Sequence, residues 1–99
     1  MVGFQIIITL DRSKRHEFFQ TFESLSRPGD REEGCLEQGL YDQVGWIDRL
    51  LWVEHWTSRT LLEAYMRSPR FQTLMGAVEV LGRMENLKIM EFGDQAVVV

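Results

Sequence analysis

The chain has 99 residues, of which 44% are hydrophobic and 26% charged, and its formal net charge is −4 at pH 7. A hydrophobic core of ordinary size uses about 100 residues, so the whole chain, 1–99, is predicted to form one domain. The excess of acidic residues disfavours nucleic acid and anionic membranes as partners, because both attract basic surfaces.

Cysteine and histidine are scarce in this chain. Cys35 is the only cysteine, which excludes an intramolecular disulfide, and with His16 and His55 it is too isolated to form a structural zinc site. No apolar run reaches the about 18 residues of a membrane span, and the apolar opening, residues 2–10, lacks the basic lead of a signal peptide. We therefore expect a cytoplasmic protein without a bound metal.

The first predicted elements are a strand and a helix. Residues 2–10 are rich in β-branched and aromatic side chains, with apolar residues at every second position, which is typical of a strand. Asp11 or Ser13 can cap a following helix, and Pro28–Gly29 would end it. The apolar residues of this helix recur at helical spacing: Phe18, Phe22 and Leu25.

Two more strands are predicted in the middle of the chain. Residues 35–41 form the weaker one, with Leu36 and Leu40 on one face and Cys35 and Tyr41 on the other. Residues 42–48 then make a connection of hairpin length, and 49–56 form a strand with apolar residues on both faces.

The last third of the chain predicts two helices and a strand. Thr57 or Ser58 can cap a short helix, and Ser68–Pro69 matches the preference for Ser at the N-cap and Pro at the first helical position of a second helix. Apolar residues continue at helical spacing until Gly82. A fourth strand is expected over 87–92, followed by an apolar tail, 96–99, that could pair with a sheet edge of its own or of a second copy.

The predicted order β-α-β-β-α-α-β is the split βαβ arrangement of an α+β, ferredoxin-like domain, in which a four-stranded antiparallel sheet has its helices on one face. A sheet with one face open to water should alternate cleanly between apolar and polar residues. The third strand instead places apolar residues on both faces: Leu50, Trp52 and Trp56 on one, and Leu51 and Val53 on the other. We therefore predict a homodimer that packs sheet against sheet.

Three segments carry a resemblance to a known family: Glu33-Gly34-Cys35-Leu36, the run from Val53 to Ser58, and the run from Leu62 to Phe71. Together they resemble the antibiotic biosynthesis monooxygenase (ABM) domain family over nearly the whole chain. The resemblance implies a dimeric α/β barrel whose pocket, between sheet and helices, binds a planar aromatic molecule. It also implies a reaction with oxygen that uses no cofactor, neither flavin nor metal.

The chain departs from the family pattern at Tyr65. Many members of the family that it resembles have a histidine there, and a phenol with a pKa near 10 is a poor general base, although it can orient a substrate. The haem-degrading branch of the same fold has a tryptophan at this position and a histidine on the next helix, where this chain has Met75. Haem degradation is therefore disfavoured.

Two residues are candidates for proton transfer. His55 shares the face of Leu51 and Val53 and could act as a base, or it could be a hydrogen-bonded histidine at an interface. Glu54 lies on the other face, beside two indoles, where desolvation would raise its pKa, or it could pair with an arginine across the dimer.

Four aromatic residues could line a flat slot for the substrate: Trp52, Trp56, Tyr65 and Phe71. The alternative is that they fill the core. The sequence thus predicts a cofactor-independent monooxygenase for a small aromatic or quinol-like compound. Its rivals are a non-catalytic module that binds or senses such a compound and a purely structural dimer. The identity of the substrate stays open.

Overall fold

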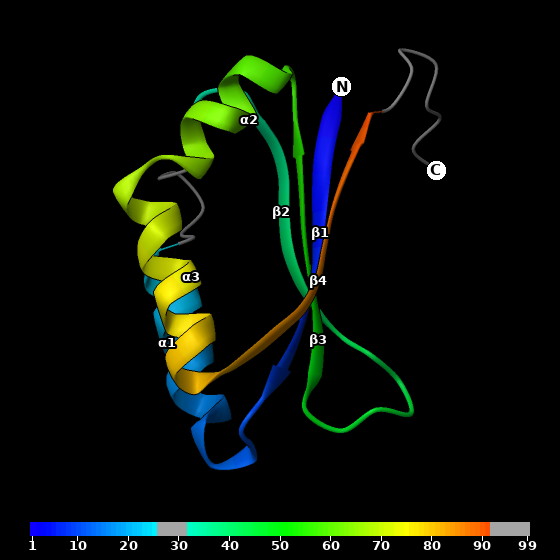
Figure 1. Cartoon of the computed structure of the whole chain (residues 1–99), viewed down its shortest axis with the longest axis vertical. Helices are drawn as coiled ribbons and strands as arrows, with labels where there is room; N and C mark the ends of the chain where they lie inside the picture. Colours follow the sequence, from blue (N-terminus) through cyan, green and yellow to red (C-terminus); the bar gives the residue numbers. More distant parts are fainter. Residues whose placement is uncertain (26–31, 92–99) are drawn as a thin grey trace.

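The computed structural model describes residues 1–25 and 32–91 and confirms the α+β, ferredoxin-like fold (Figure 1). Its elements are β1 (Val2–Leu10), a 3₁₀ turn (Arg12–Lys14), α1 (Arg15–Leu25), β2 (Cys35–Asp42), β3 (Arg49–Trp56), α2 (Arg59–Met66), α3 (Pro69–Leu81) and β4 (Gly82–Glu91). Pro28–Gly29 and the tail 96–99 lie outside the described residues.

The four strands form one antiparallel sheet in the order β2-β3-β1-β4, and all three helices lie on the same face of it (Figure 1). Since β3 and β1 are the inner strands, their helix-facing residues have neighbours on both sides. One row across the sheet is important for the site: Gln38 pairs with Glu54, Glu54 with Phe4, and Phe4 with Ile89.

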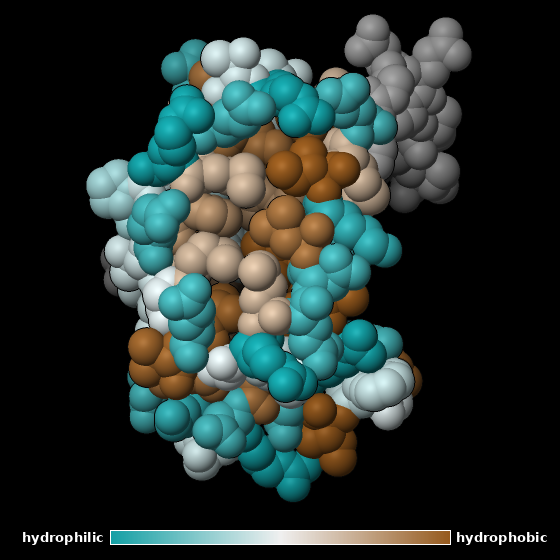
Figure 2. All heavy atoms as spheres, viewed as in Figure 1, coloured by the Kyte–Doolittle hydropathy of each residue, from teal (hydrophilic) through white to brown (hydrophobic). Residues whose placement is uncertain are grey.

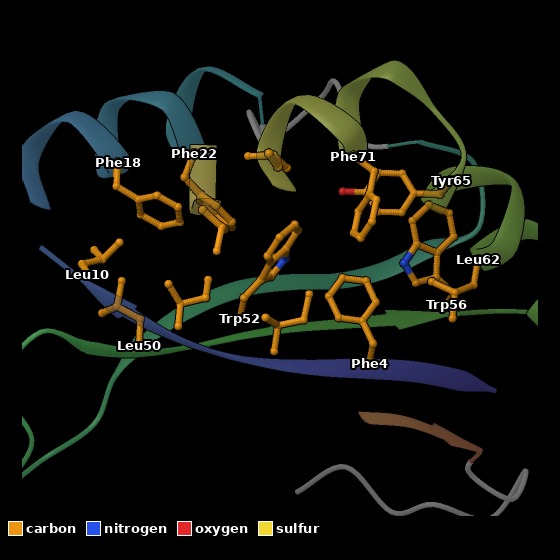
Figure 3. Packing of buried hydrophobic residues seen from close by; sticks show 14 of the residues in the cluster. Phe4, Leu10, Phe18, Phe22, Leu50, Trp52, Trp56, Leu62, Tyr65 and Phe71 are labelled. Atoms are coloured by element: carbon orange, nitrogen blue, oxygen red, sulfur yellow. The ribbon is translucent and has the colours of Figure 1, made fainter. Parts of the chain in front are cut away.

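The core lies between the sheet and the helices (Figure 3). Strand β1 contributes all five of its even-numbered residues, because side chains alternate between the faces of a strand. Helices α1 and α3 cover them with Phe18, Phe22 and Leu74. Burying one such apolar side chain contributes about 1.5–3 kcal/mol, so this layer is the main source of stability.

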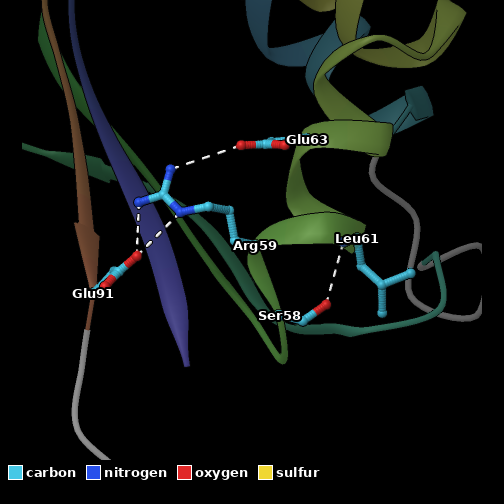
Figure 4. A network of polar contacts seen from close by, with 5 residues as sticks. All are labelled: Ser58, Arg59, Leu61, Glu63 and Glu91. Atoms are coloured by element: carbon cyan, nitrogen blue, oxygen red, sulfur yellow. Dashed lines mark hydrogen bonds and ion pairs between the residues drawn. The ribbon is translucent and has the colours of Figure 1, made fainter.

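The starts of α2 and α3 follow the predicted capping. The Ser58 hydroxyl accepts a hydrogen bond from the Leu61 backbone N–H at 3.2 Å, and the Ser68 hydroxyl accepts one from the Phe71 backbone N–H at 3.2 Å. Exposed ion pairs at the start of α2 join Arg59 to Glu91 at the end of β4 and to Glu63 (Figure 4). Such surface pairs add little stability.

The first helix differs from the prediction at its start. Asp11 precedes the 3₁₀ turn without a side-chain capping bond, Ser13 lies inside that turn, and α1 begins only at Arg15. The helical spacing of the apolar residues is nevertheless as expected, with Phe18 and Phe22 buried.

Two strands also differ from their predicted pattern. A register shift after Cys35 places this residue opposite Trp56, on the helix-facing side, and not on the face of Tyr41 as its parity predicted. Strand β4 begins at Gly82 rather than 87, because its polar first half pairs through the backbone with β1 and needs no apolar alternation. A Cβ at Gly82 would clash with the Thr9 carbonyl oxygen, so only glycine allows α3 to pass directly into β4.

Candidate functional site

The side chain of Glu54, in β3, lies on the helix-facing side of the sheet and is 0% exposed. A carboxylate is costly to bury unless its oxygens accept hydrogen bonds. Here it accepts four, all from side chains: Gln38 Nε2 at 2.8 Å, Trp52 Nε1 at 2.8 Å, Tyr65 OH at 3.0 Å and Trp56 Nε1 at 3.0 Å. We call these five residues the Glu54 cluster.

Local structure explains why these donors meet. Trp52 and Trp56 are two residues before and after Glu54 in the same strand, so alternation places all three on one face. Gln38 is the cross-strand partner of Glu54 in β2, and Tyr65 reaches the carboxylate from α2. Figure 3 shows both indole nitrogens and the Tyr65 oxygen pointing into the space between the two tryptophans.

Burial and hydrogen bonding act in opposite directions on Glu54. Desolvation is the larger effect and raises the pKa of the carboxyl above its usual range, while the hydrogen bonds from Gln38, Trp56, Trp52 and Tyr65 lower it. Burial, followed by the negative charge of Glu54, raises the pKa of the Tyr65 phenol well above its usual value. Tyr65 therefore keeps its proton and acts as a donor to Glu54.

The four predicted substrate-binding aromatics are brought together around this carboxylate. The rings of Trp56 and Tyr65 have centroids 4.7 Å apart with an interplanar angle of 30°. Phe71 lies 5.4 Å from Tyr65 and 5.6 Å from Trp52. None of the four is more than 4% exposed, so in this structure they pack against one another as well as around Glu54.

A small polar pocket adjoins the Glu54 cluster. Its volume is about 10 Å³, and it is lined by Glu32, Cys35, Gln38, Glu54, Trp56, Tyr65 and Arg70. This space is close to the minimum for one water molecule and far below the several hundred Å³ of a pocket for a small organic ligand. Within residues 1–25 and 32–91, no group of three or more His, Cys, Asp or Glu side chains is arranged to hold a metal ion.

His55, the other predicted proton acceptor, lies on the opposite face of the sheet. Its Nδ1 is 3.0 Å from Glu37 Oε2, and the Tyr41 hydroxyl donates to Glu37 Oε1 at 3.1 Å. This hydrogen bond and the charge of Glu37 raise the pKa of Tyr41. The structure thus brings Glu54 together with the four aromatics and separates His55 from them.

Gln38 was not among the site residues predicted from the sequence. Its position in a weak strand, two residues before Leu40, was the available signal: a polar residue with the parity of a core residue. Its contact with Glu54 depends on the register between β2 and β3, which the sequence does not show. Cys35 was likewise assigned to the wrong face because of the register shift.

The fold and this cluster define a ferredoxin-like domain with a carboxylate enclosed by aromatic side chains. The sequence profile of the antibiotic biosynthesis monooxygenase family matches residues 1–77, so the chain belongs to this family. No curated protein matches the chain.

Solved structures share the fold. A conserved protein from Methanosarcina mazei Go1 has 22% identity and a TM-score of 0.81, with 90% of this chain and 89% of that one covered. A conserved protein of unknown function from Bacteroides thetaiotaomicron has 20% identity and a TM-score of 0.80, covering 92% and 96%. A structure described as an antibiotic biosynthesis monooxygenase has 15% identity and a TM-score of 0.80, covering 94% and 99%. At these identities the likeness concerns the fold alone.

Among the helices in the described part of the chain, none combines the length and the apolar character that crossing a bilayer requires.

Proposed function

We propose that the protein is a cofactor-independent monooxygenase acting on a small aromatic or quinol-like compound, with Glu54 as the proton acceptor. The observation that carries the proposal is the fully buried carboxylate of Glu54 at the centre of an aromatic cluster. A carboxyl with a raised pKa can take the proton of a phenol at near-neutral pH better than an ordinary one, because its conjugate acid is weaker.

The reaction balances without a cofactor. Deprotonation by Glu54 gives a phenolate, which is electron-rich enough to reduce O₂ directly. A ring carbon that carried two hydrogens in the keto tautomer becomes a carbonyl, one oxygen atom enters the product, and the other leaves as water. The substrate supplies all the electrons, so the protein needs a base, an apolar environment and orienting groups.

We assign the proton acceptor to Glu54 rather than His55 because of their surroundings. His55 is on the face away from Trp52, Trp56, Tyr65 and Phe71, and its side chain is paired with Glu37. In this proposal Trp52, Trp56 and Phe71 shape the aromatic slot, and Tyr65, held protonated, orients the substrate.

The apolar approach to this site lies between α3 and β4. Figure 2 shows apolar side chains gathered in a hollow there, with hydrophilic side chains around it. Ile89, in the row of Glu54 and Phe4, is 41% exposed although it lies on the helix-facing side. Since the enclosed pocket is too small for an aromatic ring, we propose that a ligand enters from this hollow and that the rings of Tyr65 and Phe71 move apart to form the slot around it.

We further propose a homodimer through the sheet face that the helices leave uncovered. Ile7 and Leu51 pair on that face and are half-buried, and Val53 is 9% exposed. A second copy of the same face would cover them symmetrically. A cytoplasmic location is proposed from composition alone.

Oxygen uptake with a panel of naphthols and quinols tests the monooxygenase. We expect uptake with at least one compound, and a fall in kcat of about 10²–10⁴ in Glu54→Gln, the range for loss of a general base. Glu37→Gln, on the opposite face, is the matched control and should stay within about twofold. An equal fall in both variants, or no uptake with any compound, contradicts the assignment.

A second function is favoured by the saturation of Glu54, whose oxygens already accept four hydrogen bonds. A carboxylate held in this way could simply shape a site that binds or senses an aromatic compound. Quenching of tryptophan fluorescence by a naphthol or quinol without oxygen uptake would identify this alternative.

A further inference from the structure

The row of residues across the sheet that contains Glu54 ends in different surroundings at its β4 side and at its β2 side. On one side, Phe4 and Ile89 lead to the apolar hollow between α3 and β4. On the other side, Gln38 donates to Glu54 Oε2 at 2.8 Å and lines the polar pocket. The buried carboxylate therefore contacts an apolar region on one side and a polar one on the other.

Most residues that line the polar pocket have side-chain atoms that can hydrogen-bond to a water molecule. Besides Glu54, its lining contains the titratable groups Tyr65 of α2, Arg70 of α3, Cys35 of β2 and Glu32 just before β2. Glu32 and Arg70 are only half-buried, so the lining of the pocket includes two charged side chains that solvent reaches. A volume of about 10 Å³ accommodates about one water molecule, provided that it has two to four polar partners.

We propose that this pocket holds a water molecule that connects Glu54 to solvent as a proton path, and that Gln38 is the positioning residue at its inner end. The role in turnover rests on the proposed function. After Glu54 has taken the hydroxyl proton of a substrate, the water accepts that proton and releases one to bulk solvent, and Glu54 returns to the carboxylate. No electrons move in this step. The proton leaves by the β2 side while the ligand occupies the β4 side.

The first test measures the ionisation of Glu54 without any substrate. In a Trp46→Phe background the remaining tryptophans are Trp52 and Trp56, both hydrogen-bonded to Glu54, so their fluorescence reports its titration. Gln38→Met removes a donor to the charged form and should raise the apparent pKa of Glu54 by about one unit. Leu40→Met, on the same face of β2, should leave it unchanged.

The second test measures the path itself. After a rapid pH jump, the fluorescence change should be complete within the mixing time in the background protein and in Cys35→Ala, which leaves the pocket open. Cys35→Met, which fills the pocket, should slow that change until it takes at least ten times the mixing time. Because both Cys35 variants keep the four donors to Glu54, namely Gln38, Trp52, Trp56 and Tyr65, this pair tests access and not those hydrogen bonds.

Three results would overturn the proposal. The first is a tryptophan signal that does not titrate between about pH 4 and 9, or that titrates equally in Glu54→Gln. The others are equal apparent pKa values in Gln38→Met and Leu40→Met, and equal rates in the two Cys35 variants. If Gln38→Met fails to fold, the Cys35 pair still decides. A protein that passes these tests but consumes no oxygen with the quinol panel retains the proton path and loses the proposed function.

Discussion

Two neighbouring residues of β3, one on each face of the sheet, differ strongly in their burial and hydrogen bonding. Glu54 is fully enclosed and bonded to four side chains, whereas His55, the next residue, is partly exposed and paired with half-exposed Glu37. Both are polar and titratable, but only the helix-facing side removes water from its residue. Position in the alternation of a strand thus decides whether a carboxylate becomes a site or an ordinary surface group.

The largest expected effect compares the two carboxylates directly. Glu54→Ala leaves four donors without their acceptor, three of them on buried side chains, and should lower the free energy of unfolding by about 4 kcal/mol, at about 1–3 kcal/mol for each unpaired buried group. Glu37→Ala should cost less than about 1 kcal/mol, because its partners remain hydrated. Urea denaturation measures both, and losses of equal size would show that enclosure does not distinguish the faces.

The outer face is tested by its proposed partner. Leu51→Glu places a charge in the centre of that face and should weaken the dimer about a hundredfold or more, equivalent to about 2.7 kcal/mol. Val80→Glu, at a 70% exposed position of α3, is the control and should not change association. Sedimentation velocity at micromolar concentration gives the oligomeric state. A monomeric protein before any substitution would remove the dimer proposal.

The smallest expected change in the free energy of unfolding comes from a comparison of Tyr65 with Tyr41. Tyr65→Phe removes a buried hydrogen bond to Glu54 and should cost about 1.5 kcal/mol at pH 7, whereas Tyr41→Phe, on the half-exposed residue, should cost less than about 0.5 kcal/mol.

The raised pKa of Tyr65 also makes the stability of the protein depend on pH. The pKa of Tyr65 is higher in the folded protein than in the unfolded chain, so its contribution to stability is complete below about pH 10 and is lost as the pH rises through the folded value. Urea denaturation between pH 8 and 11 should therefore show a steeper fall in the parent protein than in Tyr65→Phe. Parallel curves would mean that the phenol is not shielded from water.

Local sequence patterns predicted much of this molecule. The alternation in residues 2–10, the helical spacing of Phe18 and Phe22, and the Ser68–Pro69 cap are all confirmed, because each depends on residues close together in the chain. The shared face of Trp52, Glu54 and Trp56 is confirmed for the same reason. Motifs within β3 and α2 also indicated the antibiotic biosynthesis monooxygenase family.

Tertiary structure decided what surrounds Glu54. Pairing with Gln38 follows from the register of β2 on β3, and the register shift at Cys35 reverses the face that simple alternation assigns to it. The approach of Tyr65 depends on how α2 lies over the sheet. Neither the register of the strands nor the placement of the helix is encoded over a few residues, since both result from the packing of the whole core. The sequence therefore indicated a carboxylate and several aromatic residues as candidates. Only the tertiary structure determined that their side chains are in contact.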